Sequence, residues 1–425
     1  MGARGALQSV WKPLDGGRWH VRIVVGHPMP ETRGDRAVTI EEDAWNIELI
    51  GHTNLGGFGD CMAVRLVDDR FAYVGHMGTD GTGTSVVDIR DLEDPRVVKR
   101  IDAPPGTRSH KVALAGEIMI VNNERNPWGG PDGGRAESWT PGIRLFDISN
   151  PASPEEVGFF PTPGLGTHRM TVIEGEPLVM ISRTDDGYSE YFFAIIDISD
   201  PSQPREVSRW WLPGMHIAGG EKPHWPEHRV WKHHHSLVRG PRAYAGWWDG
   251  GLVILDISDI RNPSLVSHLE FGEGVSARTH TALPLPGRDL LVVTDEGDAK
   301  CHEVQKLARM VDITDERSPL VIATFPVPKG DFCDRPGWAG PHNVHEMRSG
   351  TFQSSDIVHM TYFNAGLRVF DVTDAHSPQE IAYYLPAIPE GSEAIQMNDL
   401  TVSSDGTIFV TDRTGGGLYI LRMTV

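Results

Sequence analysis

The stretch Gly251–Pro263 reads GLVILDISDIRNP, and it joins a short apolar run to an abrupt stop. The apolar run, Leu252 to Leu255, is typical of a buried β-strand. The Asp, Ser and Asp residues that follow carry side chains that bond nearby backbone groups and favour a turn. Pro263 cannot continue a central strand, because proline has no backbone N–H to donate. The stretch therefore predicts a strand that ends in a tight turn.

The same phrase occurs six times along the chain. A second strand-like segment follows each proline, and two more precede each phrase, so one copy predicts four strands. Four short strands per repeat, with no helical periodicity, are typical of a β-propeller blade. The first aspartate of the phrase recurs at spacings of 59, 50, 59, 56 and 59 residues: Asp88, Asp147, Asp197, Asp256, Asp312 and Asp371.

The two ends of the chain predict how the ring closes. After the sixth phrase, the segment Asn398–Val425 supplies three strands, and NIELIG at Asn46–Gly51 is similar to an outermost strand. A propeller must hide its last open edge, so we expect Asn46–Gly51 to complete the last blade. The expected fold is all-β: a seven-bladed propeller of four-stranded blades over residues 46–425, with an N-terminal extension over residues 1–45.

Two copies of the phrase, GLVILDISD at Gly251–Asp259 and GLRVFDVTD at Gly366–Asp374, resemble the LVIVD repeat family. The resemblance extends over most of the chain, from roughly residue 60 to residue 420. It implies a β-propeller and does not by itself imply an activity.

The composition limits the classes of partner that we expect this protein to bind. The net charge of −19 argues against nucleic acid and anionic membrane surfaces. No apolar run is long enough for a signal peptide or a membrane span. The three cysteines, Cys61, Cys301 and Cys333, include no close pair, and their odd number predicts no disulfide framework. We expect a reduced, cytoplasmic protein that binds a small-molecule substrate; the oligomeric state is open.

Histidine recurs where the innermost strand of each predicted blade begins. Five of the seven such positions are histidine, although histidine accounts for only 19 of 425 residues. Innermost strands run parallel around the propeller axis, so equivalent residues should form a ring at the channel mouth. In chain order the seven positions are Asp60, His110, His168, His234, His280, His345 and Asn398.

Neutral imidazole is a common protein ligand of iron, copper and zinc, and three or four imidazoles leave a coordination position open. The pattern therefore predicts one transition-metal ion per chain, iron or copper, with zinc or manganese as alternatives. Four of the five ring histidines would bind it. His342 lies three residues before His345, on the opposite face of an extended chain, so we expect His345 to be the ligand. The arrangement, though no local motif, is similar to that of the carotenoid cleavage oxygenases, which hold iron with four histidines on a seven-bladed propeller.

Other polar and aromatic residues adjoin the ring. Three carboxylates, Glu346, Asp399 and Asp60, are candidates to orient a ligand imidazole or to move protons. A long loop before the fourth inner strand carries aromatic residues that suit a pocket wall. The predicted substrate-pocket residues are Trp225, Trp231, His235, His342 and Glu296.

These patterns predict a metal-dependent enzyme that acts on a small apolar or aromatic substrate, by oxygenase-type or metal-assisted lyase or hydrolase chemistry. The alternative is a non-catalytic propeller that serves as a binding platform for a protein partner. Two further interpretations of the histidines stay open: hydrogen bonding to the backbone of a neighbouring blade, and a metal-free acid/base cluster.

Overall fold

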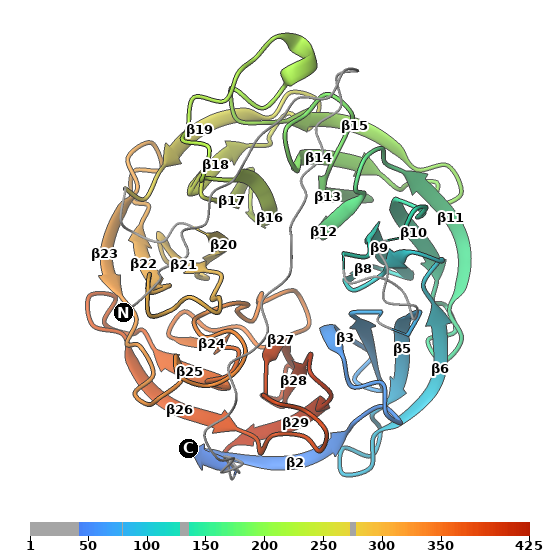
Figure 1. Ribbon diagram of the computed structural model, residues 1–425, viewed down its shortest axis with the longest axis vertical. Helices are drawn as coiled ribbons and strands as arrows, with labels where there is room; N and C mark the ends of the chain where they lie inside the picture. Colours follow the sequence, from blue (N-terminus) through green and yellow to red (C-terminus); the bar gives the residue numbers. More distant parts are fainter. Residues whose placement is uncertain (1–41, 79, 128–135, 273–277) are drawn as a thin grey trace, which may run out of the picture. The chain divides into compact units, whose positions relative to one another are not determined.

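The computed structural model describes residues 42–78, 80–127, 136–272 and 278–425. Within these ranges the protein is almost entirely β, and the one helical element is the short 3-10 helix η1 (Ile217–Gly219). Figure 1 shows the sheets arranged as a ring of radial units around a central axis. The predicted all-β propeller is confirmed. No helix of the described residues is long and apolar enough to span a membrane.

Most units consist of four strands that run in sequence order from the axis to the rim. The first is β3 (Cys61–Val67), β4 (Phe71–His76), β5 (Thr82–Asp88) and β6 (Arg96–Asp102). The second is β7 (Thr107–Arg108) with β8 (Val112–Ala115), then β9 (Ile118–Arg125), β10 (Gly142–Asp147) and β11 (Glu155–Pro161). The third is β12 (Thr167–Ile173), β13 (Leu178–Arg183), β14 (Phe192–Asp197) and β15 (Arg205–Trp210).

The next two units form one eight-stranded sheet, joined by the single residue pair Trp248 and Thr279. One half is β16 (Trp231–Arg239), β17 (Arg242–Trp248), β18 (Leu252–Asp256) and β19 (Ser264–Leu269). The other half is β20 (Thr279–Pro284), β21 (Leu290–Asp295), β22 (Ala308–Asp312) and β23 (Leu320–Thr324). The expected count of seven blades treats these halves as separate.

Strands from the beginning of the described chain complete the last two sheets. The sheet of β27 (Met397–Val402), β28 (Ile408–Asp412) and β29 (Gly417–Met423) ends in β2 (Ile47–Thr53), which pairs antiparallel with β29. This is the closure expected of NIELIG. The sheet of β24 (Ile357–Thr361), β25 (Leu367–Asp371) and β26 (Gln379–Leu385) ends in β1 (Asp43–Trp45). Residues 1–41 of the predicted extension lie outside the described residues.

The repeated phrase ends its strand as its side chains predict. In the third unit the Ser199 backbone N–H donates to Asp197 Oδ1 over 2.8 Å, two residues along the chain. The other five copies make the same bond, at 2.7 to 3.1 Å: Asp88 with Arg90, Asp147 with Ser149, Asp256 with Ser258, Asp312 with Thr314 and Asp371 with Thr373. A local side-chain bond therefore sets each of these hairpins.

The core lies between neighbouring units. One cluster contains Ile120 of β9, Ile181 of β13 and Ala245 of β17, and all three side chains have no exposed surface. Because each sheet is covered on both faces, strands such as β4 and β21 are buried along their whole length and do not alternate with exposed residues.

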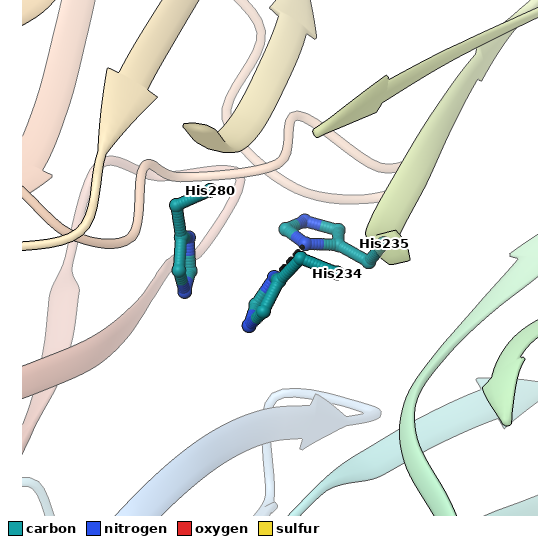
Figure 2. A group of neighbouring side chains, drawn as sticks. All are labelled: His234, His235 and His280. Atoms are coloured by element: carbon teal, nitrogen blue, oxygen red, sulfur yellow. Dashed lines mark hydrogen bonds between the residues drawn. The ribbon is translucent and has the colours of Figure 1, made fainter. Parts of the chain in front are cut away.

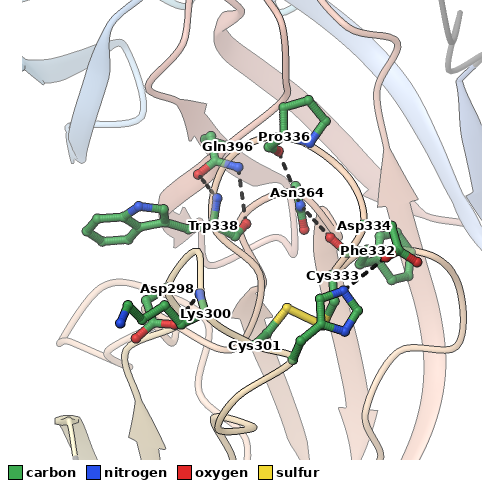
Figure 3. The surroundings of a disulfide bond; sticks show 11 residues. Asp298, Lys300, Cys301, Phe332, Cys333, Asp334, Pro336, Trp338, Asn364 and Gln396 are labelled. Carbon is green, nitrogen blue, oxygen red and sulfur yellow. Dashed lines mark hydrogen bonds and ion pairs between the residues drawn. A yellow bond between two sulfur atoms is a disulfide. The ribbon is translucent and has the colours of Figure 1, made fainter. Parts of the chain in front are cut away.

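Cys301 and Cys333 form a disulfide, with their Cα atoms 5.7 Å apart, so the expectation of reduced cysteines without a disulfide is wrong (Figure 3). The two residues lie 32 positions apart, in the segments that follow β21 and β23. A bridge between Asp298 and Ala339 holds these segments side by side, and no sequence spacing could show that. Disulfides persist mainly in oxidising compartments, so this bond lends no support to the predicted cytoplasmic location.

Candidate axial histidine site

A β-bulge recurs where the innermost strand begins. In β12, Thr167 pairs with Arg183 and Arg169 with Ser182, which leaves His168 without a partner residue. The same shift leaves out His280 in β20, and a longer one includes His234 in β16. A bulge re-aims side chains, so the bulged residue and the next residue can both face the axis. The shifts at Met62 in β3 and Asn398 in β27 follow the same rule.

The bulges bring the imidazoles into contact. His168 Nε2 lies 3.1 Å from His234 Nε2, and His234 Nδ1 lies 2.9 Å from His235 Nδ1. The ring centres of His234 and His280 are 3.8 Å apart, and Figure 2 shows His280 facing His234 from the neighbouring strand. Three predicted ring histidines therefore meet on the axis, with His235 as a fourth imidazole behind His234.

Two more imidazoles lie at the ends of this group. Together they form a row in the order His110, His168, His234, His280 and His342. The ring centre of His110 is 5.2 Å from that of His168, and His110 Nε2 is buried with no hydrogen-bond partner among the described residues. The ring centre of His342 is 4.3 Å from that of His280. His342 Nδ1 donates to the Asn398 carbonyl over 2.6 Å, so its Nε2 carries the lone pair in the neutral ring.

Glu124 determines the tautomer of His168. Its carboxylate accepts a hydrogen bond from His168 Nδ1 at 3.1 Å, which leaves the Nε2 lone pair directed at His234. Arg108 lies 2.6 Å from the same carboxylate, and the Tyr191 hydroxyl also donates to it. Burial alone would raise the pKa of Glu124, but Arg108 and His168 hold it well below its ordinary value.

The axial imidazoles are neutral. Burial lowers the pKa of His168 to about 4, although Glu124 opposes the shift. Burial, with the nearby cations and histidines, also holds the pKa of four other imidazoles well below the usual range, and these are His110, His234, His280 and His342. Neutral imidazole is the form that binds metal ions.

His345 lies outside the row, contrary to its predicted place in the ring. Its Nε2 donates to the Phe352 carbonyl over 2.9 Å, and its ring faces His359. His342 takes the position, because its N–H donates to the Thr361 carbonyl while the Thr361 N–H donates to Asn343. This register repeats that of His110 and Lys111 in the second unit, where the Asn122 N–H donates to the Lys111 carbonyl.

Asp60 also lies outside the predicted ring. Its carboxylate contacts His76 Nδ1 at 2.9 Å and the Gly78 N–H at 3.1 Å. The bulge of β3 falls two residues later, at Met62, which lines the axial cavity. Asn398 lies at its expected bulge, and its side chain donates to the Met62 carbonyl over 2.8 Å, across the closure between the last and first sheets.

Glu346 and Asp399 belong to a buried ion-pair cluster beside the inner strands. Glu346 contacts Arg169 at 2.6 Å and His235 Nε2 at 3.8 Å, and Asp399 contacts Arg65 at 3.0 Å. Neither carboxylate lines the axial cavity. Their contacts tie neighbouring strands together, and Glu346 also lies next to the ring of His235, one imidazole away from His234.

A cavity of about 610 Å³ lies over the imidazoles, and residues from nearly every sheet line it. Glu296 and His342, two predicted pocket residues, are among them, whereas His235 lies behind His234. The other two predictions differ from the structure, because Trp225 and Trp231 stack on each other with ring centres 4.4 Å apart, away from the cavity. The tryptophans that line it are Trp248 and Trp338.

Sequence reasoning missed Glu124, which contacts the centre of the row. Its position was the available signal, because Glu124 is the next-to-last residue of β9, Glu296 directly follows β21, and both line the cavity. Three groups of side chains on the axis each have ligand atoms within 4.8 Å of one another, and two of the groups share His280. They are His234, His235 and His280; His110, Glu124 and His168; and His280, Glu296 and His342.

Comparison with known proteins agrees with this architecture. The LVIVD repeat model matches residues 140–162, 191–210 and 237–270, so the chain contains LVIVD repeats. The crystal structure of the Myceliophteria thermophila Cps50 (Swd1) β-propeller domain is similar at a TM-score of 0.55 and 12% identity, covering 86% of this chain and 98% of that one. The computationally designed Ika8 protein gives a TM-score of 0.48 at 11% identity, with 88% and 98% covered. No curated protein sequence matches the chain.

Proposed function

We propose that this LVIVD-repeat β-propeller is a metal-dependent enzyme that holds one transition-metal ion per chain on its axis. The observation that carries the proposal is the 3.1 Å distance between His168 Nε2 and His234 Nε2. Two nitrogens bound to one tetrahedral ion at about 2.0–2.1 Å lie roughly 3.3 Å apart. The pair is therefore spaced as two ligands of a single ion.

The neighbouring imidazoles supply the remaining ligands. His280 lies against His234, and His110 has its buried, unpartnered Nε2 beside His168. These four histidines form the proposed ligand set, and His342 replaces His345 as the fifth candidate. All-nitrogen ligands suit iron, copper or zinc, and manganese remains an alternative.

The residues around the histidines have separate roles in the proposal. Glu124 holds His168 as the Nδ1–H tautomer and keeps its Nε2 available. A bound ion would supply Lewis-acid or redox chemistry at an open position that faces the cavity. Trp248 and Trp338 offer apolar walls for a small aromatic or apolar substrate. Oxygenase-type chemistry and metal-assisted lyase or hydrolase chemistry both fit this arrangement.

Elemental analysis of protein made without a histidine tag or chelator tests the proposal. We expect about one ion per chain in the wild type and under about a tenth of that in His234→Ala. The matched control is His359→Ala, because His359 is equally buried but does not line the cavity. It should keep the metal, and both variants should retain the β-type circular dichroism of the wild type.

A wild-type protein without metal, which added Fe(II), Cu(II), Zn(II) or Mn(II) does not load, would contradict the proposal. That outcome would favour the non-catalytic platform for a protein partner. Equal metal content in His234→Ala and the wild type would show that the ion does not bind at the row of imidazoles.

A further inference from the structure

The axial cavity has the opposite charge balance to the chain as a whole. The protein carries a net charge of −19, but the charged residues that line the cavity are five cationic and three anionic side chains. The cations are Arg108, Lys111, Arg125, Lys232 and Arg413, and the anions are Glu124, Glu190 and Glu296. A cavity in an acidic protein thus gathers positive charge, which attracts anions.

Two of the cations lie on the faces of tryptophans that line the cavity and form no ion pair among the described residues. Lys232 Nζ lies 3.3 Å from the ring centre of Trp248. The guanidinium of Arg413 lies 4.3 Å from the ring centre of Trp338, and its one hydrogen bond to a side chain is a 3.4 Å contact with Gln396. Cation–π contacts orient a cation but leave its N–H donors free for an acceptor.

Lys111 is the most buried of the cavity cations, with 4% of its surface exposed. Its ammonium donates one bond, to the Met62 carbonyl at 3.1 Å. An ammonium has three donors, and a buried charge without a counter-ion is costly. An anion in the cavity would offset that cost.

The carboxylates of the cavity form no close ion pair with Lys111, Lys232 or Arg413, although Glu190 and Glu296 interact electrostatically with Lys232. Glu124 is engaged with Arg108 and His168. Neither Glu190 nor Glu296 forms an ion pair with a lysine or arginine of the described residues, and Glu296 contacts His342 Nε2 at 3.9 Å.

We propose that the cavity binds a small carboxylate with an aromatic body, its charge held by Lys111, Lys232 and Arg413 and its ring against Trp248 and Trp338. This inference deepens the proposed function, because it names the substrate class of the same cavity. The binding contacts belong to the chain itself, so they persist in protein without metal.

Isothermal titration with benzoate and phenylacetate, each paired with its amide, tests the charge requirement. We expect at least one acid to bind at least about tenfold tighter than its amide, because a charge-assisted bond adds more than 1.4 kcal/mol. Lys232→Met should remove most of that difference while the affinity for the amide stays the same. The matched control, Lys222→Met, alters an exposed lysine outside the cavity and should change nothing.

Arg413→Met provides an independent test if Lys232→Met does not fold, and it should show the same selective loss. Equal binding of acid and amide, or no binding of either acid, would overturn the inference. Tighter binding of phenyl phosphate than of the acids would overturn the carboxylate assignment. Titrations before and after treatment with a chelator separate the two proposals, because acid binding to a metal-free protein would support this inference while the metal assignment failed.

Discussion

The hairpin turns that follow the third strands and the starts of the innermost strands both repeat around the ring, but they repeat different things. Every turn of the repeated phrase has the same aspartate and the same bond to the backbone two residues later. The strand starts repeat a bulge whose residue varies, as at Met62, His168 and Asn398. The repeat thus maintains a backbone geometry at the axis and leaves the side chains free to specialise.

The two regions also differ in how their polar atoms are satisfied. The turn aspartates are solvated and bonded locally. On the axis, buried atoms such as His110 Nε2, His235 Nε2 and Asn398 Oδ1 have no hydrogen-bond partner among the described residues. Buried polar groups are normally paired, so a cluster of exceptions is a place for a ligand, ion or water.

The largest expected effect concerns the disulfide. It holds together the segments that follow β21 and β23, whereas local hydrogen bonds hold the turns. Removing the disulfide with Cys301→Ser and Cys333→Ser should lower the free energy of unfolding by about 3.7 kcal/mol, as expected for a loop of this length. Urea titration measures the loss. Dithiothreitol should destabilise the wild type by a similar amount and leave the variant unchanged; a stable, reductant-insensitive wild type would contradict the expectation.

Two Glu–Arg pairs, one on the axis and one on an outer hairpin, allow the two regions to be compared directly. Glu124 contacts Arg108 at 2.6 Å on the axis, and Glu156 contacts Arg144 at 2.7 Å on an outer hairpin. Glu124→Gln should weaken metal binding by about 10 to 100-fold, because the amide no longer fixes the tautomer of His168. Glu156→Gln should leave the metal affinity unchanged. Competition with a chromogenic chelator measures both, and equal affinities would remove Glu124 from the site.

As the pH falls, the folded protein should lose stability first through its buried histidines and only later through the turn aspartates. Burial, with a smaller effect of His345, lowers the pKa of His359 to about 3, so the unfolded chain binds the proton first as the pH falls below about 6.5. Between pH 7 and pH 5, His359 alone should cost about 2 kcal/mol of stability. Between pH 7 and pH 5, the free energy of unfolding of His359→Phe should fall by about 2 kcal/mol less than that of the wild type. Urea titrations at the two pH values measure this, and an unchanged pH dependence would contradict it.

The smallest expected effect is at a single turn. Asp371→Ala removes the acceptor for the Thr373 N–H and should cost about 1 kcal/mol or less, because the site is solvated. Asp371→Asn keeps an acceptor oxygen and should cost less than the alanine variant. Thermal melts of the pair check the order, and the metal content of both variants should equal that of the wild type.

Much of the site could be predicted because it follows from a regular repeat. His110, His168, His234 and His280 all lie in the row, as their common place before an apolar inner strand indicated. The error at His345 falls where the repeat is irregular. Between Trp338 and Ile357 the inner segment of the sixth unit forms no regular strand, so the alignment chose His345 in place of His342.

The amino-acid sequence by itself determined the strands, their turns and the closing of the ring, because these depend on interactions between residues a few positions apart and on an edge that must be covered. Only the tertiary structure decided which side chains meet. His168 and Glu124 are 44 positions apart, and Cys301 and Cys333 are 32 apart. Such contacts depend on strand register, and a bulge of one residue is enough to exchange the side chain that faces the axis.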